Sequence, residues 1–552
     1  MKFMRFAQNK IESLGHGLFG FISNNAFLDN PTFRGLRCSL LECYDELYIL
    51  NLHGDARKKE KTPQGAKDEN VFNIQQGVSI NLFVKNPQTT KQKIHYYDVY
   101  GERAEKYAFL AQNDLNSIEW LELTPRKPFY LLLPLETRLL DEYEQGFSVK
   151  KMFQISSVGI VTGKDRIFIA NNTESLKEQV LKYCNEFNEQ CIKDIHYRPF
   201  DIRKVYYDTK KLERARENTF KHMLPPPPPT NPRTPNQTRK NVALNTPRQL
   251  KNNDKSWTQC FISSRINDQG LSSGGNGAGV NYPLYQFRDP NYTENFTPEF
   301  RSFIDKHYNH SFEPLEILGY IYALLYSPNY RKRYERFLKI DYLKILFTKN
   351  KDLFRALSLL GIELIGLHVL NQESLNYSFE KLKDATIGES CYIEGHERNP
   401  IISKKPSHNE QRLYINHSAY FRGVSQEIYD YRIGGYCVLD KYLTSHKNEP
   451  CDFDHVTRII KVIARTIEIQ KTLGFLTSDL PHLKGNDSKA LMQEILQNPP
   501  PPFNTNTALI LSRQAKAIGD FDFDAAFISK EASDNNIYRR GGGLAFPLFC
   551  IT

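Results

Sequence analysis

The first 85 residues constrain the fold more than any other part of the chain. Short apolar runs at residues 18–23, 47–52 and 78–84 are typical of buried strands, and residues 33–41 carry apolar side chains at helical spacing. The order strand, helix, strand, loop, strand is that of one side of an open α/β sheet. No earlier residues of this chain supply the other side, so we expect an incomplete sheet.

This region resembles the post-catalytic half of an adenine-specific DNA amino-methyltransferase, and in particular the large single-polypeptide type ISP restriction-modification enzymes. The matching pieces are FMRFAQNKI (3–11), GFISNNAFLDNPTFRGLR (20–37), YILNLHGDARKKE (48–60) and KDENVFNIQQGVSINLFVK (67–85). Further matches extend to about residue 478. The resemblance implies an α/β protein in which an incomplete, Rossmann-like amino-methyltransferase sheet is followed by an α+β target-recognition domain.

Enzymes of this kind bind S-adenosylmethionine through a glycine-containing turn and hold an extruded adenine with an Asn-Pro-Pro-aromatic motif. The base leaves the duplex because its amine cannot be reached inside the stack. In the family's order both motifs would precede Met1. The resemblance therefore implies no catalytic and no cofactor-binding residue in this chain, and S-adenosylmethionine is expected to bind only the complete enzyme. The sequence predicts no metal site.

Two motifs that look catalytic are not expected to be so. Asn498-Pro499-Pro500 is followed by Pro501 instead of an aromatic residue and lies in a proline run. The glycines at 274–279 lack the Lys-Ser/Thr that follows a phosphate-binding loop. We expect a flexible loop there.

Motifs and composition divide the chain into four parts, with a main boundary near Phe147. The predicted parts are the end of a methyltransferase domain (1–85), a connector holding one apolar strand (86–147), a target-recognition domain with a proline-rich insertion at 225–240 (148–478), and a truncated repeat of residues 222–285 (479–552). Both copies of the repeat contain a proline run, Arg-Gln, Phe-Ile-Ser and Pro-Leu-aromatic in the same order. The second copy is either a stored recognition segment or a gene-fusion scar.

Basic residues next to aromatic ones mark the first candidate DNA contacts. Residues 155–170 are predicted as two strands joined at 163–165, with Lys164 and Arg166 placed to meet phosphates. In YRPFDIRKVYYD (197–208), Arg198 and Arg203 are placed to reach the DNA backbone or a base edge. The alternative is an internal ion pair of Asp201 with either arginine.

Three further candidates lie elsewhere in the chain. Arg248 and Gln249 follow a predicted strand, and these side chains grip guanine and adenine in bidentate fashion, although a structural pair at a strand end fits equally. Arg331 and Arg333 lie on a basic helix that either follows a phosphate backbone or is simply solvated. Phe72 falls in the motif whose aromatic packs on the extruded base in resembling enzymes, or is a core phenylalanine.

Composition limits the class of protein. The 552 residues carry a formal net charge of +10, which permits a polyanionic partner. The cysteines form no C-x-x-C pair, and neither a signal peptide nor a bilayer-length apolar run is present, so we expect a cytoplasmic protein without a membrane partner.

The sequence as a whole predicts the C-terminal part of a site-specific adenine-N6 DNA methyltransferase of a restriction-modification system. This part would recognise the target in double-stranded DNA and complete the methyltransferase sheet of an upstream chain. Two alternatives stay open: a stand-alone DNA-binding specificity subunit, and an inactive remnant of a disrupted gene.

Overall fold

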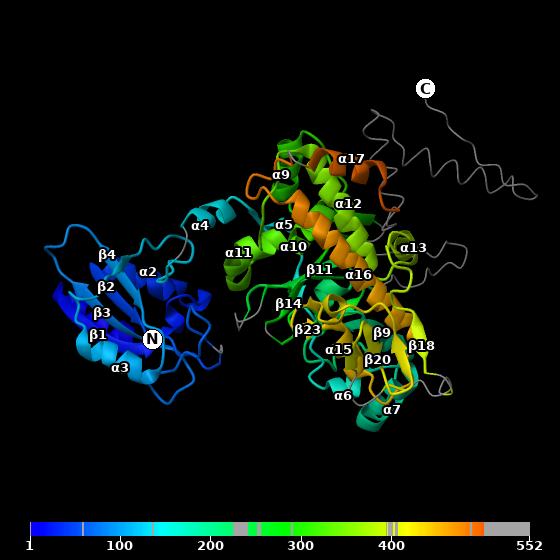
Figure 1. The fold of residues 1–552 in the computed structure, drawn as a ribbon, viewed down its shortest axis with the longest axis horizontal. Helices are drawn as coiled ribbons and strands as arrows, with labels where there is room; N and C mark the ends of the chain where they lie inside the picture. The colour runs from blue at the N-terminus through cyan, green and yellow to red at the C-terminus, as the bar shows by residue number, and fades with distance from the viewer. Residues whose placement is uncertain are drawn as a thin grey trace, which may run out of the picture.

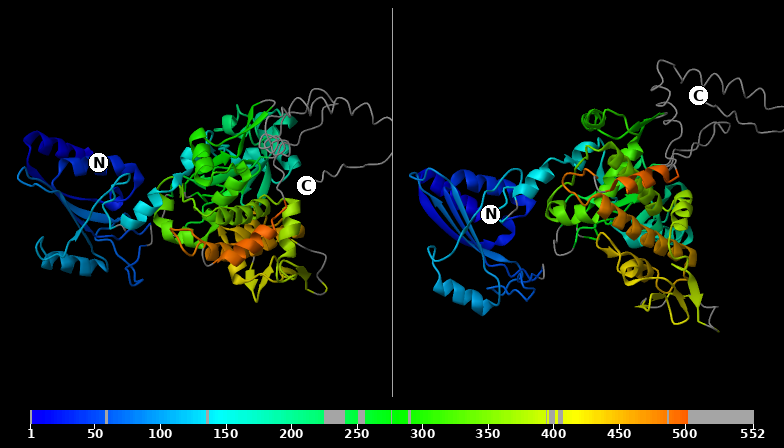
Figure 2. Two further views of the ribbon diagram at one scale, coloured as in Figure 1. Left: turned by 90° about the horizontal axis from the view of Figure 1, so that it is seen from above. Right: turned by 45° about the horizontal axis from the view of Figure 1, so that its top comes forward.

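The computed structural model describes residues 2–57, 60–134, 137–224, 241–250, 256–275, 277–288, 291–393, 395, 401–402, 407–485 and 488–501. The predicted insertion at 225–240 and residues 502–552 of the predicted repeat lie outside this set. Figure 1 shows a small N-terminal unit built on a sheet and a larger unit, with helix α4 (Thr137–Glu144) between them. The two further views in Figure 2 show the same arrangement. The fold is mixed α/β with several small sheets.

The N-terminal unit is built on a five-stranded sheet with the order β1-β3-β2-β4-β5. Its strands are β1 (Gly17–Asn24), β2 (Glu46–Asn51), β3 (Val78–Lys85), β4 (Lys93–Asp98) and β5 (Leu121–Glu122). Strand β3 runs antiparallel to both β1 and β2, whereas β4 runs parallel to β2. The three strands and the helix expected in the first 85 residues are confirmed, the helix being α2 (Arg34–Cys43).

Helices cover the two faces of this sheet unequally. Helices α1 (Lys2–Leu14) and α2 pack on one face, where their apolar side chains join a core with those of β2, β3 and β4. Helix α3 (Arg103–Gln112) packs on the opposite face through Phe109 and Leu110, over the carboxyl end of β2 and the start of β3. Two short 3-10 turns, Asn25–Phe27 and Pro31–Phe33, lead from β1 into α2.

The segment predicted as a connector differs from expectation. Strands β4 and β5 and helix α3 all lie within 86–147, so the sheet extends beyond residue 85. The strand expected at 126–136 is absent from the described part of that segment. Pro128 and Pro134 bracket the apolar run and carry no N–H for a ladder. The buried Arg37 instead donates two hydrogen bonds to the Phe129 carbonyl, at 3.0 and 2.7 Å.

The larger unit combines helices with small sheets. Its described helices are α5 (Val149–Met152), α6 (Asp165–Phe168), α7 (Thr173–Cys184), a 3-10 turn (Glu189–Cys191), α8 (Glu217–Phe220), α9 (Pro298–Tyr308), α10 (Pro314–Tyr326), α11 (Pro328–Ile340), α12 (Lys351–His368), α13 (Gln372–Glu380), α14 (Gln426–Tyr429), α15 (Val438–Ser445), α16 (Phe453–Leu476) and α17 (Lys489–Gln497). Its principal sheets have the orders β13-β9-β10-β8, β12-β11-β14-β7 and β18-β21-β20-β19.

Most strands of this unit are short. They are β6 (Phe147–Ser148), β7 (Ser157–Val158), β8 (Ile169–Ala170), β9 (Ile192–Arg198), β10 (Asp201–Tyr206), β11 (Ala243–Pro247), β12 (Phe261–Ser263), β13 (Ile266–Asn267), β14 (Gly279–Pro283), β15 (Tyr285–Arg288), β16 (Asn291–Glu294), β17 (Lys344–Ile345), β18 (Ser390–Tyr392), β19 (Ser407–Asn409), β20 (Arg412–Tyr414), β21 (Ala419–Phe421), β22 (Arg432–Ile433) and β23 (Tyr436–Cys437). One hydrophobic core joins the helices to the β11 sheet.

The crossing of α10 and α12 organises that core. A Cβ on Gly361 would lie 1.8 Å from the Gly319 carbonyl oxygen, so the two backbones touch directly. His368, near the end of α12, is fully buried and contacts Tyr322 at 2.6 Å, as expected of a core histidine. No single described helix is long and apolar enough to cross a membrane; α12 and α13 pass that test only as a pair bent by 115°.

The two strands expected at 155–170 do not pair with each other. Strand β7 pairs with β14 and strand β8 with β10, so they belong to different sheets. Instead of a tight turn, the short helix α6 lies between them, because the N–H groups of Ile167 and Phe168 both donate to the Lys164 carbonyl. The basic motif at 197–208 contains the end of β9 and the whole of β10, which pair antiparallel.

Candidate functional site

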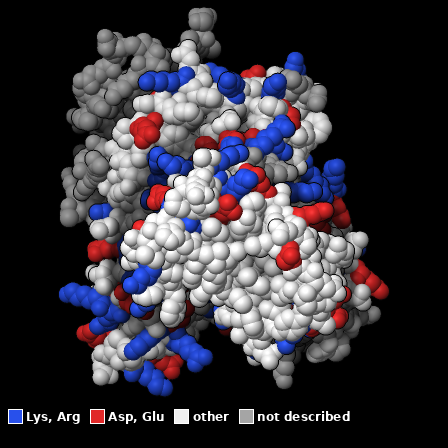
Figure 3. Space-filling view, turned by 90° about the vertical axis from the view of Figure 1, so that its left-hand side faces the viewer, with Lys and Arg blue, Asp and Glu red and all other residues white. Residues whose placement is uncertain are grey.

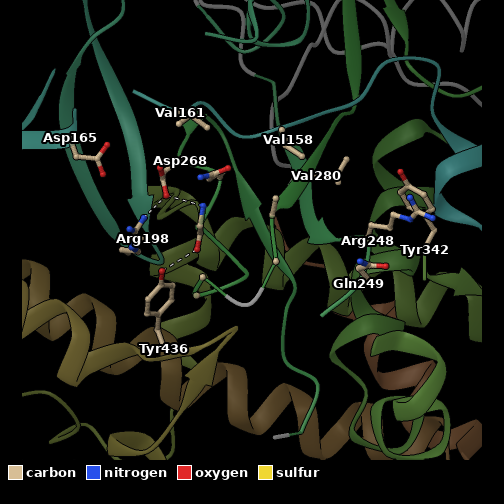
Figure 4. Close-up of a pocket in the computed structure, with 16 residues that line it drawn as sticks. Val158, Val161, Asp165, Arg198, Arg248, Gln249, Asp268, Val280, Tyr342 and Tyr436 are labelled. Carbon is tan, nitrogen blue, oxygen red and sulfur yellow. Dashed lines mark hydrogen bonds and ion pairs between the residues drawn. The ribbon is translucent and has the colours of Figure 1, made fainter. Parts of the chain in front are cut away.

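A cleft of about 750 Å³ opens in the larger unit, between the sheet that contains β9 and the sheet that contains β7 and β14 (Figure 4). Arg198, Asp268 and Tyr436 stand on one side, and Arg248, Gln249 and Tyr342 on the other, as Figure 4 shows. The fold thus brings predicted site residue Arg198 to the same cleft as Arg248 and Gln249, which lie about 50 positions later in the chain.

Arg198, at the end of β9, forms an ion pair with Asp268 at 2.6 Å. Its guanidinium lies 3.9 Å from the centre of the Tyr197 ring and 5.6 Å from that of Tyr436. Burial alone would lower the pKa of Arg198, but the Asp268 carboxylate raises it above its ordinary value. Arg198 is therefore a charged group fixed in the cleft wall.

Arg203 is tied to its neighbour on the same strand. Its Nε and Nη2 donate to the Asp201 carboxylate at distances of 2.7 to 3.1 Å. Burial favours the neutral form of Asp201, but hydrogen bonds from His446 and Arg203 outweigh it and hold the pKa at about 2. Of the two ion pairs that the sequence allowed, the structure forms Asp201–Arg203.

Arg248 is the most accessible cation in the cleft wall. It follows β11, its Nε donates to Asp341 at 3.0 Å, and its guanidinium lies 5.1 Å from the Tyr342 ring centre. Its side chain is still 45% exposed, against 17% for Arg198. Asp341 is bound through Nε alone, and Arg248 lines the cleft beside Gln249.

Glycines bring two loops into contact at the floor of the cleft. A Cβ on Gly274 would lie 2.6 Å from Gly435 Cα, and one on Gly434 would lie 1.9 Å from the Ser272 carbonyl oxygen. Gly274 and Gly434 also have φ values of 61° and 62°, which L side chains rarely adopt. Gly274 of the predicted glycine loop therefore packs against the turn between β22 and β23, whereas Gly277 lies against the Gln249 backbone and a Cβ on Gly275 would have no atom within 4 Å.

The other residues predicted at this end of the molecule flank the cleft. Lys164 lies over the Tyr183 ring, 4.3 Å from its centre, and its ammonium donates to the Tyr183 hydroxyl. Arg166, on α6, is exposed and has no hydrogen bond or ion pair to any described residue. Asp165, between them, lines the cleft.

The basic helix α11 directs its arginines elsewhere. Arg333 makes two hydrogen bonds to Glu142 of α4, at 3.1 and 2.7 Å, and Arg336 donates to the Pro134 carbonyl at 2.7 Å. Arg331 stacks on Tyr326, 4.4 Å from the ring centre. Helix α11 thus joins the larger unit to α4 and the preceding segment. The sequence pattern did not predict these contacts of its arginines.

Phe72 lies away from the cleft, in the loop between β2 and β3, with 42% of its surface exposed. It is therefore not the ordinary core phenylalanine that was the alternative. Near the carboxyl ends of β2 and β4, His53 lies between Glu60 and Asp98, at 2.7 and 2.6 Å. Burial opposes charge on His53, yet these hydrogen bonds raise its pKa above the ordinary value.

Sequence reasoning missed several residues of the cleft. Asp268, Tyr342 and Tyr436 also line it, and Asp341 binds Arg248 beside it. Tyr342 and Tyr436 both lie in stretches rich in aromatic and basic residues. Among the described residues, no group of three or more His, Cys, Asp or Glu side chains is placed to hold a metal ion.

The model of the Type ISP C-terminal specificity domain matches residues 182–472. This match covers more than half of the chain and includes most of the cleft, and the chain belongs to this family. None of the curated proteins matches the chain in sequence.

Solved structures agree with this assignment. A nuclease-deletion mutant of the Type ISP restriction-modification enzyme LlaGI, in complex with a DNA substrate mimic, matches 87% of this chain and 47% of its own, with a TM-score of 0.58 and 20% identity. The ATP-dependent Type ISP restriction-modification enzyme LlaBIII bound to DNA matches 85% of this chain and 34% of its own, with a TM-score of 0.61 and 21% identity. A DrdV–DNA complex matches 87% of this chain and 52% of its own, with a TM-score of 0.60 and 19% identity. These likenesses establish a shared fold, and the chain spans about a third to a half of each solved chain.

Proposed function

We propose that this chain recognises a DNA target sequence as the specificity part of a restriction-modification enzyme, and that the cleft reads the bases. The observation that carries this is Arg248 beside Gln249, both facing the cleft. A half-exposed guanidinium suits guanine, and an amide suits adenine. The three solved relatives were each determined with DNA.

A salt titration of duplex-DNA binding tests this proposal. A pool of duplexes with randomised sequence, selected on the purified chain, supplies the probe. We expect log K to fall linearly with log salt, because bound phosphates release counterions. The double variant R248A/Q249A loses the selected preference, whereas R138A, which removes an exposed guanidinium on α4, keeps it. A chain that binds no duplex at low salt refutes the proposal.

We further propose that the N-terminal sheet is completed by a segment carrying the cofactor and Asn-Pro-Pro-aromatic motifs, on the same or another polypeptide. Strand β1 ends the sheet, and its Leu18 and Ile22 are 63% and 51% exposed. On α1, Phe3, Phe6 and Leu14 are also exposed. In Figure 3, where the N-terminal unit faces the viewer, a broad part of the surface has no charged side chain. Such a surface is typical of one that a partner covers.

The completed enzyme would transfer a methyl group from S-adenosylmethionine to an extruded adenine. S-adenosylmethionine would supply the methyl group, and this chain would contribute recognition and the face around Phe72. Joining the chain to a segment with the missing motifs should allow tritiated methyl incorporation into adenine. L18D/I22D should abolish incorporation while duplex binding stays unchanged. Incorporation that survives this variant contradicts the proposed docking.

A further inference from the structure

Asp341, which directly follows helix α11, is shared by arginines from the two units. Its Oδ1 accepts a hydrogen bond from Arg248 Nε at 3.0 Å, and its Oδ2 lies 3.6 Å from Nη1 of Arg34. Arg248 lines the cleft, whereas Arg34 is the first residue of α2 in the N-terminal unit. One carboxylate therefore connects the N-terminal unit to a residue that we propose to read bases.

The backbone beside Arg248 is fastened to the same end of α11. The Leu250 N–H donates to the Lys339 carbonyl at 2.9 Å. Figure 1 shows α11 on the side of the larger unit that is nearest the N-terminal unit. Helix α11 also contacts α4 and the segment before it, through Arg333 and Arg336. The side chain of Arg248 and the backbone next to it are thus both held at the junction of the two units.

A second arginine–aspartate pair in this protein has a different geometry. Arg203 donates from Nε to Oδ1 of Asp201 at 3.0 Å and from Nη2 to Oδ2 at 2.7 Å. Such a two-pronged pair is a frequent arrangement of arginine on a carboxylate. Arg248, by contrast, donates to Asp341 through Nε alone, and the second oxygen lies beside Arg34. The difference follows if Arg34 occupies the oxygen that a two-pronged pair would need.

We propose that Arg34 and Asp341 are positioning residues for Arg248, and that Arg34 keeps Arg248 from closing a two-pronged pair on Asp341. This inference rests on the proposed function, since it assumes that Arg248 reads a base. A guanidinium bound through Nε keeps both Nη groups for the O6 and N7 acceptors of guanine, whereas a two-pronged pair uses one of them. Base reading in the cleft then depends on a residue of the N-terminal unit.

Competition binding tests the positioning role. The probes are the selected duplex and the same duplex changed only at the base pair where R248A relaxes selection. One bidentate contact corresponds to roughly 5- to 150-fold discrimination, and R34A should lower it at least about threefold at this base pair alone. R34K should keep most of the discrimination, because an ammonium still occupies the second oxygen of Asp341.

The matched control is R126A. Arg126 is as exposed as Arg34, at 48% against 49%, and it pairs with Asp141 away from the cleft. R126A should leave the discrimination unchanged. Because Arg34 is half-exposed, its pair contributes little to stability, so R34A should unfold at the same urea concentration as the unmodified chain. If R34A does not fold, R34Q, which keeps the length of the side chain, takes its place in the same experiment.

The variant D341N tests the route through Asp341. An amide offers one acceptor oxygen and one donor group, so Arg248 cannot form a two-pronged pair with it. R34A should therefore lower the discrimination of the unmodified chain but not that of D341N. An equal effect of R34A in the two backgrounds means that the residues act independently, and it overturns the proposal.

A crystal structure of R34A without DNA tests the geometry by itself. We expect Arg248 to donate from both Nε and Nη2 to Asp341, as Arg203 does to Asp201. A pair that is still made through Nε alone overturns the proposal.

The outcomes separate this inference from the proposed function. If R248A relaxes no base pair, base reading by Arg248 fails, and the crystal structure still decides whether Arg34 controls the pair. If R248A relaxes one base pair and R34A leaves it unchanged, the positioning role is overturned while base reading stands. Equal weakening of all duplexes by R34A would make Arg34 a phosphate contact, which also overturns the positioning role.

Discussion

The cleft and helix α11 contain similar basic residues and use them differently. Arg248 keeps almost half of its side chain exposed and lines a hollow, with Asp341 as its ion-pair partner among the described residues. Arg333 carries two hydrogen bonds to Glu142, and Arg336 donates to a backbone carbonyl. Net charge therefore says little about where DNA binds. The deciding quantity is whether a guanidinium still has donors without a protein partner.

The largest change in stability is expected at Arg198, because its ion pair with Asp268 holds one wall of the cleft. R198A leaves Asp268 buried without its cation, and we expect a loss of about 3–5 kcal/mol in the free energy of unfolding at pH 7. Urea titration measures this loss. A loss below about 1 kcal/mol would show that the cleft wall does not depend on the pair.

The pH dependence of this loss shows whether it comes from the charge on Asp268. Burial raises the pKa of Asp268 above its ordinary value even with Arg198 present, and removing the cation raises it further. Because the folded pKa then lies above the unfolded one, protonation favours the folded state. The deficit of R198A should be full above the folded pKa and should shrink as the pH falls toward the ordinary value. A deficit that does not change with pH contradicts this.

The next largest effect tests base reading directly. R248A should weaken binding to the selected duplex by about 1–3 kcal/mol, the value of one bidentate contact, and relax selection at one base pair. Competition against the randomised pool measures both quantities. Equal weakening for selected and random duplexes would mean that Arg248 meets a phosphate.

A smaller effect is expected on α11. R333A should lower the free energy of unfolding by about 1 kcal/mol or less, because the pair with Glu142 is partly exposed. The slope of log K against log salt should stay the same. K332A, on the exposed side of the same helix, is the matched control and should change neither quantity. A slope reduced by about one in R333A would restore α11 as a phosphate contact.

The smallest effect is expected beside the cleft. R166A should weaken binding a few-fold and equally for all duplexes, and should reduce the salt slope by about one, as for a single phosphate contact. Stability should not change, because Arg166 has no partner among the described residues. A sequence-dependent effect of R166A would extend the reading surface to α6.

Local patterns in the sequence predicted the local features. The strands of the first 85 residues followed from their apolar spacing. The Asp201–Arg203 pair was one of two ion pairs that the sequence allowed, and it forms between residues two apart on a strand, which share a face. The Arg198–Asp268 pair did not follow, since it needs β13 to lie parallel to β9 from a distant part of the chain. Likewise, nothing in the sequence around Arg333 indicates Glu142, 191 positions earlier.

Strand β4 was missed for a related reason. Its residues, KIHYYD, alternate weakly and include charged side chains, and its place in the sheet depends on parallel pairing with β2. The contact between the glycines at 274, 434 and 435 could not be predicted from the sequence either. Each fits a turn, and only the structure shows that two turns touch through their backbones.

That contact has a consequence for how specificity can change. Gly274 lines the cleft and its backbone meets Gly435, while Gly434 meets Ser272 in the same way. Arg248 and Gln249, which we propose to read bases, line the cleft on another side. Side chains at 248 and 249 can therefore be exchanged without repacking what lies beneath them. Under the proposed function, replacing Arg248 and Gln249 would change the DNA target while the backbone contacts beneath them stay the same.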